Sequence, residues 1–376
     1  MNVVVIHQAR ALAALGHEVE ILTRRSSPDA PAVSRLGDGL VLRLLDAGPP
    51  HPLPKGEHEL VIDEFSARLA ELGPYDVHHS HHWFSGMAAL PVARHRGTPH
   101  VQSFHSIAAD PSTPLSEGER PESPGRLRGE ARLARESDAV VAISAAEAHT
   151  VETRLRGDPT RIWVVPPGVD GDLFHPWTGG HRGTGYVVAA ARLQPLKGLD
   201  LAIQAVAAVP AELRPELIVA GEASADFDGY VDGLRALADS LGISETVHFI
   251  GPQPRPDLAA LLCESRLVLV PSHSETYGLV ALEASASGVP VIASASGGLT
   301  EAVVDGETGI VLDSRDPAVW GSAIARVLGD PELAGSFARA GRARAEQLSW
   351  HRSAVSLLDC YREVLLGEAA RARATR

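Results

Sequence analysis

The sequence predicts an α/β protein with two doubly wound domains, each built on a parallel sheet. Short apolar runs, such as LVLV at 267–270 and VIA at 291–293, alternate with helical segments along most of the chain, and this pattern is typical of parallel sheets. The alternation stops at 166–184, a Gly- and Pro-rich stretch, and then restarts. A length of 376 residues also suits about two domains.

In the first half, helices are expected where apolar residues recur every three to four positions, and strands where they form short runs. Gly16 closes the first helix, and the segments 48–54 and 110–124, rich in Pro and polar residues, are expected to be loops. The expected order is helix 5–15, strands 19–23 and 40–45, helix 60–72, strand 76–79, a helix ending near 95, strand 100–104, helix 125–136, strand 139–143, helix 145–155 and strand 162–165.

The second half follows the same alternation, and the breaker Gly288-Val289-Pro290 separates a helix from a buried strand. We therefore expect a first domain at 1–167, a linker at 168–184, a second domain at 185–349 and a C-terminal helical segment at 350–376. The expected order is strand 186–190, helix 198–209, strand 217–220, helix 228–241, strand 247–250, helix 257–263, strand 267–270, helix 279–287, strands 291–293 and 309–312, and helices 317–328, 331–346 and 350–366.

Composition excludes several classes of protein. With 22% charged and 44% hydrophobic residues, the chain is globular, and a net charge of −13 argues against nucleic acid as a partner. No apolar run is long enough to span a membrane, and no signal peptide is visible. Cys263 and Cys360 lie in apolar helical contexts, which fits a reduced, cytoplasmic setting.

The stretch 271–298, PSHSETYGLVALEASASGVPVIASASGG, is where we expect the functional site. Glu275 falls in a loop after a buried strand and Glu283 in the following helix, so both can face a crevice at the carboxyl ends of the strands. A helix that begins after Gly278 also offers free N–H groups to an anion. The spacing alone does not separate this from two solvated carboxylates, which are common on protein surfaces.

The E-x7-E spacing, followed by GVPVIAS and Gly297-Gly298, resembles the donor site of retaining GT-B glycosyltransferases of family 4. The Gly278-Leu279 step and Pro290 fall in register, and Tyr277 stands where the family usually has Phe. The resemblance covers nearly the whole chain. It implies two Rossmann-like domains facing a cleft, a last helix that crosses back to the first domain, and transfer of a hexosyl group from a nucleoside diphosphate.

By this resemblance, Arg192 and Lys197 in AARLQPLKG neutralise the donor diphosphate, a role that suits a guanidinium and an ammonium group. Glu283 is implied to accept the ribose hydroxyls, and Glu275 to lie near the donor sugar. An arbitrary R-x4-K could equally be two solvated cations. The further residues implied to bind the donor are Gly221, Glu222, Arg255, Tyr277, Gly278, Leu279 and Val280.

His105 ends a first-domain strand and is implied to contact a hydroxyl of the donor sugar, as a catalytic residue with Arg192, Lys197 and Glu275. The leaving phosphate is implied to take the acceptor proton itself on the same face, so the protein supplies positioning and charge stabilisation. No nucleophile dyad is visible. Since two cations can neutralise the leaving group, we expect neither a metal site nor a cofactor beyond the UDP-sugar co-substrate.

Within family 4, the first domain resembles the actinobacterial enzymes that transfer N-acetylglucosamine to inositol phosphate in mycothiol synthesis. Lys55 and Arg126 match positions implied to bind the acceptor phosphate, and Ser106 stands where that group has Thr. His82, in SHHW, is on the acceptor side but stands where that group has Tyr. Another cyclitol, an aminocyclitol or a sugar phosphate therefore stays open as acceptor, and enzymes like sucrose-phosphate synthase share much of the pattern.

The front of the chain departs from the family pattern. In relatives, a first strand and a Gly-Gly loop precede a segment like Met1-Asn2-Val3. Without that strand, its neighbours in the first sheet lack a ladder partner, at about 1 kcal/mol for each lost hydrogen bond. We therefore expect a true start upstream or a truncated chain, and the loss of diphosphate-binding amides if the chain begins at Met1.

Other interpretations remain open from the sequence. His78, His79, His81 and His82 suggest a metal site, but alternation on a strand splits them between two faces and no acidic or Cys residue is adjacent. A UDP-sugar epimerase shares the fold and donor, and a nucleotide-sugar-binding protein would bind UDP without turnover. A storage-polysaccharide polymerase resembling glycogen synthase is disfavoured by the short chain. The sequence is also compatible with a homodimer.

Overall fold

The chain folds into two compact units, each with its own core. The structure, a computed structural model, describes residues 2–53, 55–110, 112, 122–177, 185–223, 227 and 229–374. The first unit combines Met1–Thr113, Pro121–Gly168 and Trp350–Arg376, and the second is built from Val169–Ser349. The segment 110–124, expected to be a loop, and the segment 166–184, expected to be the linker, lie partly outside the described residues.

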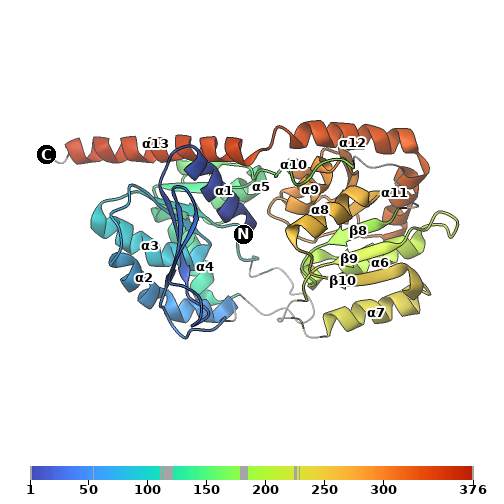
Figure 1. Cartoon of the computed structure of the whole chain (residues 1–376), viewed down its shortest axis with the longest axis horizontal. Helices are drawn as coiled ribbons and strands as arrows, with labels where there is room; N and C mark the ends of the chain where they lie inside the picture. Colours follow the sequence, from blue (N-terminus) through green and yellow to red (C-terminus); the bar gives the residue numbers. More distant parts are fainter. Residues whose placement is uncertain are drawn as a thin grey trace. The chain divides into compact units, whose positions relative to one another are not determined.

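The second unit is a six-stranded parallel sheet with strand order β10-β9-β8-β11-β12-β13. Helix α6 packs against α7 and α11, and α9 packs against α8, α10 and α12, so that helices cover the sheet on both sides (Figure 1). The elements are β8 (Val187–Ala190), η3 (Pro195–Lys197), α6 (Leu199–Ala208), β9 (Leu217–Ala220), α7 (Tyr230–Ser240), η4 (Ser244–Thr246), β10 (Val247–Gly251), α8 (Arg255–Glu264), β11 (Leu267–Val270), α9 (Leu279–Ala286), β12 (Val291–Ser294), α10 (Leu299–Ala302), β13 (Gly309–Leu312), α11 (Pro317–Gly329) and α12 (Pro331–Ala345).

The strand order of the second unit reverses between β8 and β11. From β8 the chain adds β9 and β10 on one side, and it then returns to place β11, β12 and β13 on the other. Two neighbouring parallel strands whose connections leave in opposite directions open a crevice at their carboxyl ends, where such sheets bind ligands. We therefore expect a ligand site in the loops that follow β8 and β11.

Burial explains why the second half was predictable. All four residues of β11 and of β12 are buried, because a parallel strand between helices is covered on both faces and carries a continuous apolar run. Leu217, Leu267 and Trp320 are fully buried in the same core. Each such side chain contributes about 2 kcal/mol from the surface it removes from water.

The first unit has two sheets. The four-stranded sheet β4-β5-β6-β7 is parallel, and the three-stranded sheet β1-β3-β2 is separate from it. In the described part of the chain, no strand pairs with the outer side of β1 or of β4. The elements are α1 (Asn2–Ala14), β1 (Val19–Arg24), β2 (Val33–Gly37), β3 (Leu40–Leu45), η1 (Lys55–Val61), α2 (Ile62–Ala70), β4 (His78–His81), α3 (Trp83–Arg96), β5 (His100–Ser103), α4 (Pro124–Glu136), β6 (Ala139–Ala142), α5 (Ala145–Thr153), η2 (Pro159–Arg161), β7 (Ile162–Val164) and α13 (Trp350–Ala374).

The α/β class with Rossmann-like parallel sheets is confirmed, but the expectation of uniformly parallel strands is wrong at β2. Strand β2 is antiparallel to β3, with which it forms a hairpin. Its residues are mostly exposed, so it lacks the apolar run that marks a buried strand. The dipeptide Asp38-Gly39 between the two strands is a known hairpin signal and could have revealed it.

Helix α13 belongs to the first unit, although more than 180 residues separate it from the rest of that unit in the sequence. Its Leu357 and Cys360 share a core with Leu12 of α1 and Val101 of β5, and α1 and α13 lie side by side (Figure 1). The Gln8 side-chain amide donates to the Ser353 hydroxyl at 3.0 Å. The C-terminal helix therefore completes the covering of the first unit's sheet.

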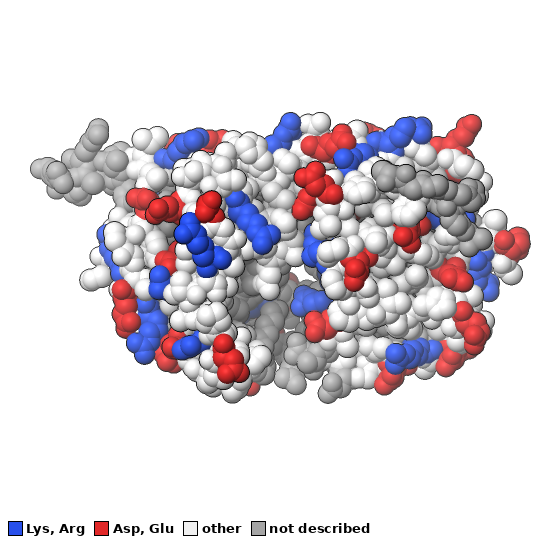
Figure 2. All heavy atoms as spheres, in the orientation of Figure 1, with Lys and Arg blue, Asp and Glu red and all other residues white. Residues whose placement is uncertain are grey.

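Acidic and basic side chains are interspersed on the face drawn in Figure 2. The acidic net charge of −13 is therefore not concentrated on that face of either unit. Within the described residues, no helix combines the length and apolarity needed to cross a membrane.

Candidate functional site

Lys197 and Glu275 meet at the carboxyl ends of β8 and β11. Lys197 ends the short helix η3 after β8, and Glu275 lies in the loop after β11. The Lys197 Nζ atom is 2.6 Å from Glu275 Oε2, and both side chains are mostly buried. The Ser272 hydroxyl donates to the same carboxylate oxygen at 3.3 Å. The structure thus brings together two residues that the sequence analysis assigned to donor binding, at the point where the strand order reverses.

Gly198 is what allows these two loops to approach. It has a φ of +63°, and a Cβ atom at this position would lie 2.1 Å from the carbonyl oxygen of Pro271. Such a contact cannot be relieved, because the neighbour is backbone. The residue is therefore restricted to glycine by conformation and by space. It ends η3 and begins α6, so the turn that carries Lys197 is held against the loop that carries Glu275.

Glu283 is the second carboxylate of the E-x7-E pair, and it lies in α9 with 3% of its surface exposed. Arg255, at the start of α8, donates from Nη1 to Glu283 Oε1 at 2.6 Å. Burial raises the pKa of Glu283, and the Arg255 guanidinium opposes that shift. The Arg255 guanidinium also lies 4.6 Å above the ring of Phe174. A carboxylate this deeply buried needs such a partner in order to remain charged.

Helix α9 begins without a side-chain cap. Gly278 is its N-cap residue, with a φ of +102° and no side chain to accept from the first turn. The N–H groups at Leu279 and Val280 therefore have no partner within the helix, as is general for a first turn. Tyr277 is buried just before this turn, and burial raises the pKa of its phenol to about 12. A first turn with such N–H groups can receive an anion or hydroxyl oxygens.

The loops after β8, β9 and β10 lie next to each other. The Leu193 N–H donates to the Glu222 carbonyl at 2.8 Å, and the Gly221 N–H donates to the Gly251 carbonyl at 2.9 Å. Arg192, two residues beyond the end of β8, has an exposed side chain. The predicted donor residues therefore occupy one end of the second unit's sheet, although Arg192 does not share the buried ion pairs of Lys197 and Arg255.

In the first unit, two imidazoles meet where β4 and β5 end. His105 follows β5 with a φ of +57°, which is unusual for a residue other than glycine. Its Nε2 atom is 2.8 Å from Nδ1 of His81, the last residue of β4, and the two rings stack with centroids 5.1 Å apart. Burial lowers the pKa of both groups, to about 4 for His81. Both imidazoles are therefore neutral at pH 7, and one of them donates to the other.

The histidine contacts continue away from the strand ends. The ring of His79 lies 4.3 Å from that of His81 on the same face of β4. Its Nδ1 atom is 2.6 Å from the Tyr361 hydroxyl of α13, and its Nε2 atom is 2.9 Å from the Ser103 hydroxyl. Burial lowers the pKa of His79 and raises that of Tyr361. A chain of half-buried side chains, Tyr361, His79 and His81, thus links helix α13 to His105.

The metal interpretation of the His-rich segment is not supported by its arrangement. His78 lies on the opposite face of β4 from His79 and His81, and His82 is the N-cap residue of α3. Among the described residues, no group of three or more His, Cys, Asp or Glu side chains could hold a metal ion.

Glu147 supports the segment at His105, and the sequence analysis missed it. It lies in the first turn of α5, where the Ser144 hydroxyl accepts from the Glu147 N–H at 3.0 Å. Its Oε2 atom accepts from the Ile143 N–H at 2.7 Å, and its carboxyl group also bonds the backbone of His105. Burial raises the pKa of Glu147 to about 7. The spacing Ser144-x-x-Glu147 is a capping-box signature, and this signal could have identified the residue.

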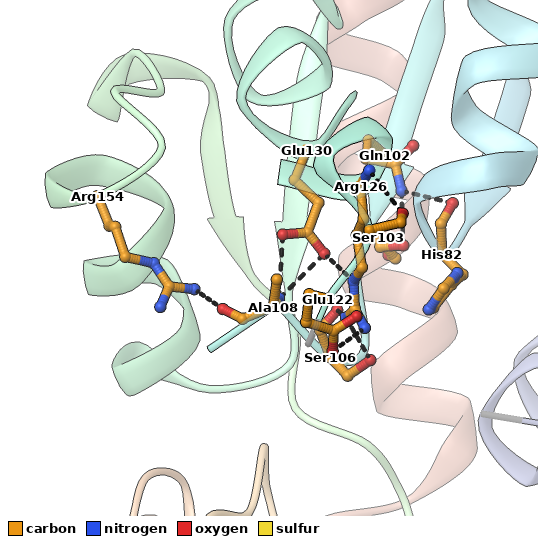
Figure 3. Close-up of polar contacts among 10 residues, drawn as sticks. His82, Gln102, Ser103, Ser106, Ala108, Glu122, Arg126, Glu130 and Arg154 are labelled. Atoms are coloured by element: carbon orange, nitrogen blue, oxygen red, sulfur yellow. Dashed lines mark hydrogen bonds and ion pairs between the residues drawn. The ribbon is translucent and has the colours of Figure 1, made fainter. Parts of the chain in front are cut away.

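Arg126 is the centre of a polar cluster at the start of α4 (Figure 3). The Ser123 hydroxyl caps the helix by accepting from the Arg126 N–H at 3.1 Å, and this fixes where the side chain emerges. The guanidinium donates to Glu130 and Glu122 at 2.7 Å each, and to the carbonyl and hydroxyl of Ser106 at 3.0 and 3.2 Å. The structure therefore unites Arg126 and Ser106, as the phosphate hypothesis requires, and adds two carboxylates that it did not foresee.

The structure says less about the other two residues that we expect to bind the acceptor, His82 and Lys55. His82 has a φ of +75°, its N–H donates to the Ser103 carbonyl at 2.8 Å, and its ring is tilted against Phe84 at 4.3 Å. Lys55 begins the short helix η1, but its side chain lies outside the described residues. The acceptor hypothesis therefore depends on Arg126 and Ser106.

Two family models match the chain. The model described as Glycosyltransferase Family 4 matches residues 1–173, and the model described as Glycosyl transferases group 1 matches residues 178–344. Their boundary falls in the segment that separates the two units. The two matches together extend over nearly all of the sequence.

Curated relatives match over almost the full length. The D-inositol 3-phosphate glycosyltransferase of Acidothermus cellulolyticus is 37% identical over 97% of this chain and 86% of its own length. The proteins of the same name from Salinispora arenicola and Mycobacterium avium are each 39% identical over 97% of this chain. The match extends over 87% of the first protein and 89% of the second.

Solved structures have the same arrangement of elements. Sucrose-phosphate synthase from Thermosynechococcus elongatus matches with a TM-score of 0.88 and 26% identity, over 97% of this chain and 94% of that one. The Anabaena protein HepE, in complex with UDP and glucose, matches with a TM-score of 0.70 and 22% identity over 85% of each chain. At that identity, the second likeness concerns the fold alone.

Proposed function

This chain belongs to glycosyltransferase family 4, and on that premise we propose that it transfers N-acetylglucosamine or glucose from a UDP-sugar to a cyclitol phosphate. The chain is a retaining glycosyltransferase of the GT-B fold that uses a nucleotide sugar and a sugar or cyclitol acceptor. The observation that supports the proposal most directly is the Lys197–Glu275 ion pair at the strand-order reversal of the second unit, together with the Arg255–Glu283 ion pair between α8 and α9.

For the donor, each group has a chemical role that fits its surroundings. Lys197 and Arg192 supply positive charge to the diphosphate, and the uncapped turn at Leu279 and Val280 adds N–H donors. Glu283 has only acceptor oxygens, so it can take the hydrogen bonds of both ribose hydroxyls if Arg255 shifts. Glu275 holds Lys197 and is the carboxylate nearest to it, which suits a place beside the donor sugar.

For the acceptor, the polar cluster of Arg126 and Ser106 supports recognition of a phosphate. A buried guanidinium beside a hydroxyl is a pairing that suits a phosphate oxygen. The names of the curated relatives support inositol phosphate in particular. Lys55 is proposed as the second cation of this site, and His82 as a contact to the acceptor ring.

In the proposed reaction, the C1–O bond to the leaving diphosphate breaks while the acceptor oxygen bonds to C1 on the same face. The leaving phosphate oxygen takes the acceptor proton, so no protein side chain forms a covalent intermediate. Lys197 and Arg192 stabilise the negative charge that develops on the leaving group. His105 is half-buried and its pKa is lowered, so its neutral imidazole can position a sugar hydroxyl through a hydrogen bond.

We also propose, on chemical grounds, that turnover needs no divalent metal, because two cations serve the diphosphate. A cytoplasmic location is proposed because the buried cysteines Cys263 and Cys360 form no disulfide within the described residues, which suits a reducing compartment.

The test is UDP release from UDP-N-acetylglucosamine and UDP-glucose, with inositol phosphate, inositol and no acceptor, in EDTA. The expected result is release that requires an acceptor, is faster with inositol phosphate than with inositol, and yields an α-linked product by NMR. Equal rates with both acceptors, together with an unchanged Lys55→Ala variant, would reject the phosphate acceptor. Release without any acceptor, or binding of UDP without turnover, would reject transfer.

A further inference from the structure

All three guanidinium nitrogens of Arg126 already have an acceptor within the protein. Nε donates to Glu130, Nη1 donates to Glu122, and Nη2 donates to the carbonyl and hydroxyl of Ser106 (Figure 3). The Arg126 side chain is only 3% exposed. A phosphate that binds a guanidinium in bidentate fashion needs two neighbouring N–H groups. One of the present acceptors must therefore leave before Arg126 can hold a phosphate.

Glu130 is not the one that leaves. Its side chain is 1% exposed, and both of its carboxylate oxygens accept from the Ala108 N–H, at 3.1 and 3.0 Å. Ala108 is itself held, because its carbonyl accepts from Arg154 (Figure 3). Loss of Arg126 would leave a buried carboxylate without its counter-charge, which is costly. Glu130 is therefore a fixed part of the cluster.

Ser106 is also retained on chemical grounds. Its contribution includes a main-chain carbonyl, which can leave Arg126 only if the backbone at Ser106 itself moves. A hydroxyl that lies 3.2 Å from Arg126 can itself donate to a phosphate oxygen, so it supports the ligand instead of competing with it.

Glu122 has the opposite properties. Its side chain is one-third exposed, and it precedes α4, outside the regular helix. Within the described part of the chain, its hydrogen bond to Arg126 Nη1 is the polar contact of its carboxylate. Two carboxylates against one guanidinium also leave this cluster with an excess of one negative charge, which repels a phosphate dianion.

We infer that Glu122 is a competing carboxylate that occupies the phosphate position on Arg126 and yields it to the phosphate group of the acceptor. This rests on the proposed function, and it adds that the site is closed by a competing carboxylate when no phosphate is present. An acceptor without phosphate cannot displace Glu122, because it offers Arg126 no negative charge in exchange. Glu122 therefore weakens phosphate binding, and replacing it is expected to raise the preference for a phosphorylated acceptor.

The direction of the change in phosphate affinity distinguishes competition by Glu122 from direct binding of the acceptor by Glu122. If Glu122 competes with the phosphate, replacing it with Gln strengthens phosphate binding. If Glu122 instead accepts hydroxyls of the acceptor, the same change weakens binding. Because the Glu122 side chain is one-third exposed and solvent weakens its ion pair, the expected gain in phosphate affinity is only about three- to tenfold.

The experiment compares Glu122→Gln with Glu136→Gln as a control, because Glu136 ends α4 and pairs with Arg132 and Arg94 and, among the described residues, has no ion pair with Arg126. Glu122→Gln is expected to lower KM for inositol phosphate by about three- to tenfold and to leave KM for inositol within about twofold. Calorimetric titration with inorganic phosphate is expected to show a similar gain in affinity, and this measurement does not depend on turnover. Glu136→Gln should change neither.

The outcomes separate the inference from the proposed function. If the wild-type enzyme prefers inositol phosphate but Glu122→Gln raises or does not change KM and phosphate affinity, the inference is wrong and the function stands. If the wild-type enzyme shows no turnover but Glu122→Gln binds inorganic phosphate more tightly, the competing role of Glu122 is supported and the reaction is wrong. A gain of equal size for inositol and inositol phosphate would also overturn the inference.

Discussion

The ammonium of Lys197 and the carboxylate of Glu275 are 2.6 Å apart, 78 positions distant in the sequence, at the two strands where the order of the second unit's sheet reverses. This pair means that the cation proposed for the donor diphosphate is already neutralised before the donor arrives. A diphosphate must therefore compete with Glu275 for Lys197 or share it. Because both side chains are mostly buried, the contact is stronger than a surface ion pair.

Lys197→Ala is expected to lower kcat by about 100- to 1000-fold, because the developing charge on the leaving phosphate loses a donor and faces an unpaired Glu275. Lys197→Arg, which keeps the charge, should retain much more activity. The measurement is UDP release at saturating donor and acceptor. A Lys197→Ala enzyme within about threefold of wild type would remove Lys197 from the diphosphate site.

The contact between His81 and His105 predicts that His81 orients the imidazole of His105. His81→Phe keeps a ring but removes Nδ1, and we expect kcat to fall by about tenfold with little change in KM for the acceptor. His81→Asn keeps a polar atom near the Nδ1 position and should restore part of that loss. If both variants unfold at lower temperature but turn over normally, the contact serves stability alone.

His100 gives a prediction for the pH dependence of stability. It is buried between the hydroxyls of Ser80 and Ser137, and burial lowers its pKa to about 3. The unfolded chain therefore binds a proton below pH 6.5 that the folded protein does not bind until near pH 3. His100 consequently stabilises the fold above pH 6.5, and this contribution is lost as the pH falls toward 3.

His100→Gln should reduce the slope of unfolding free energy against pH by about 1.4 kcal/mol per pH unit between pH 6 and pH 4. Denaturant unfolding at several pH values measures this slope. Glu147, whose pKa is raised to about 7, changes in the opposite sense in both proteins and cancels in the comparison. Parallel curves for the two proteins would mean that His100 does not carry the acid sensitivity.

The strands of the second unit could be predicted well from the sequence, because each is marked by its own short run of apolar residues. The strand expected at 267–270 is β11, and the strand end that precedes Glu275 follows directly from that run. A strand that is buried on both faces is a continuous run of apolar residues, and such a run is easily recognised in a sequence. The strand β2 was missed for the opposite reason, since its exposed residues carry no periodic signal.

Partners of the site residues were much harder to predict. The positions of Arg126 and Ser106 came from resemblance, and the spacing of Glu122 and Glu130 four positions either side of Arg126 is an ion-pair signal that was not used. The contact of His79 with Tyr361 spans 282 positions. Contacts of this kind depend on how distant helices and strands pack, and a pattern of neighbouring residues does not contain that information.

Phe174 is fully buried in the stretch that leads into the second unit, and the guanidinium that pairs with Glu283 rests on its ring. A ribose that binds the Glu283 carboxylate in place of Arg255 would move the Arg255 guanidinium off the Phe174 ring. Nucleotide binding at the proposed site would then change the surroundings of Phe174 through the Arg255 side chain. Amide hydrogen exchange across 169–177 should respond to added UDP, and an unaltered exchange rate there would show that no such relay operates.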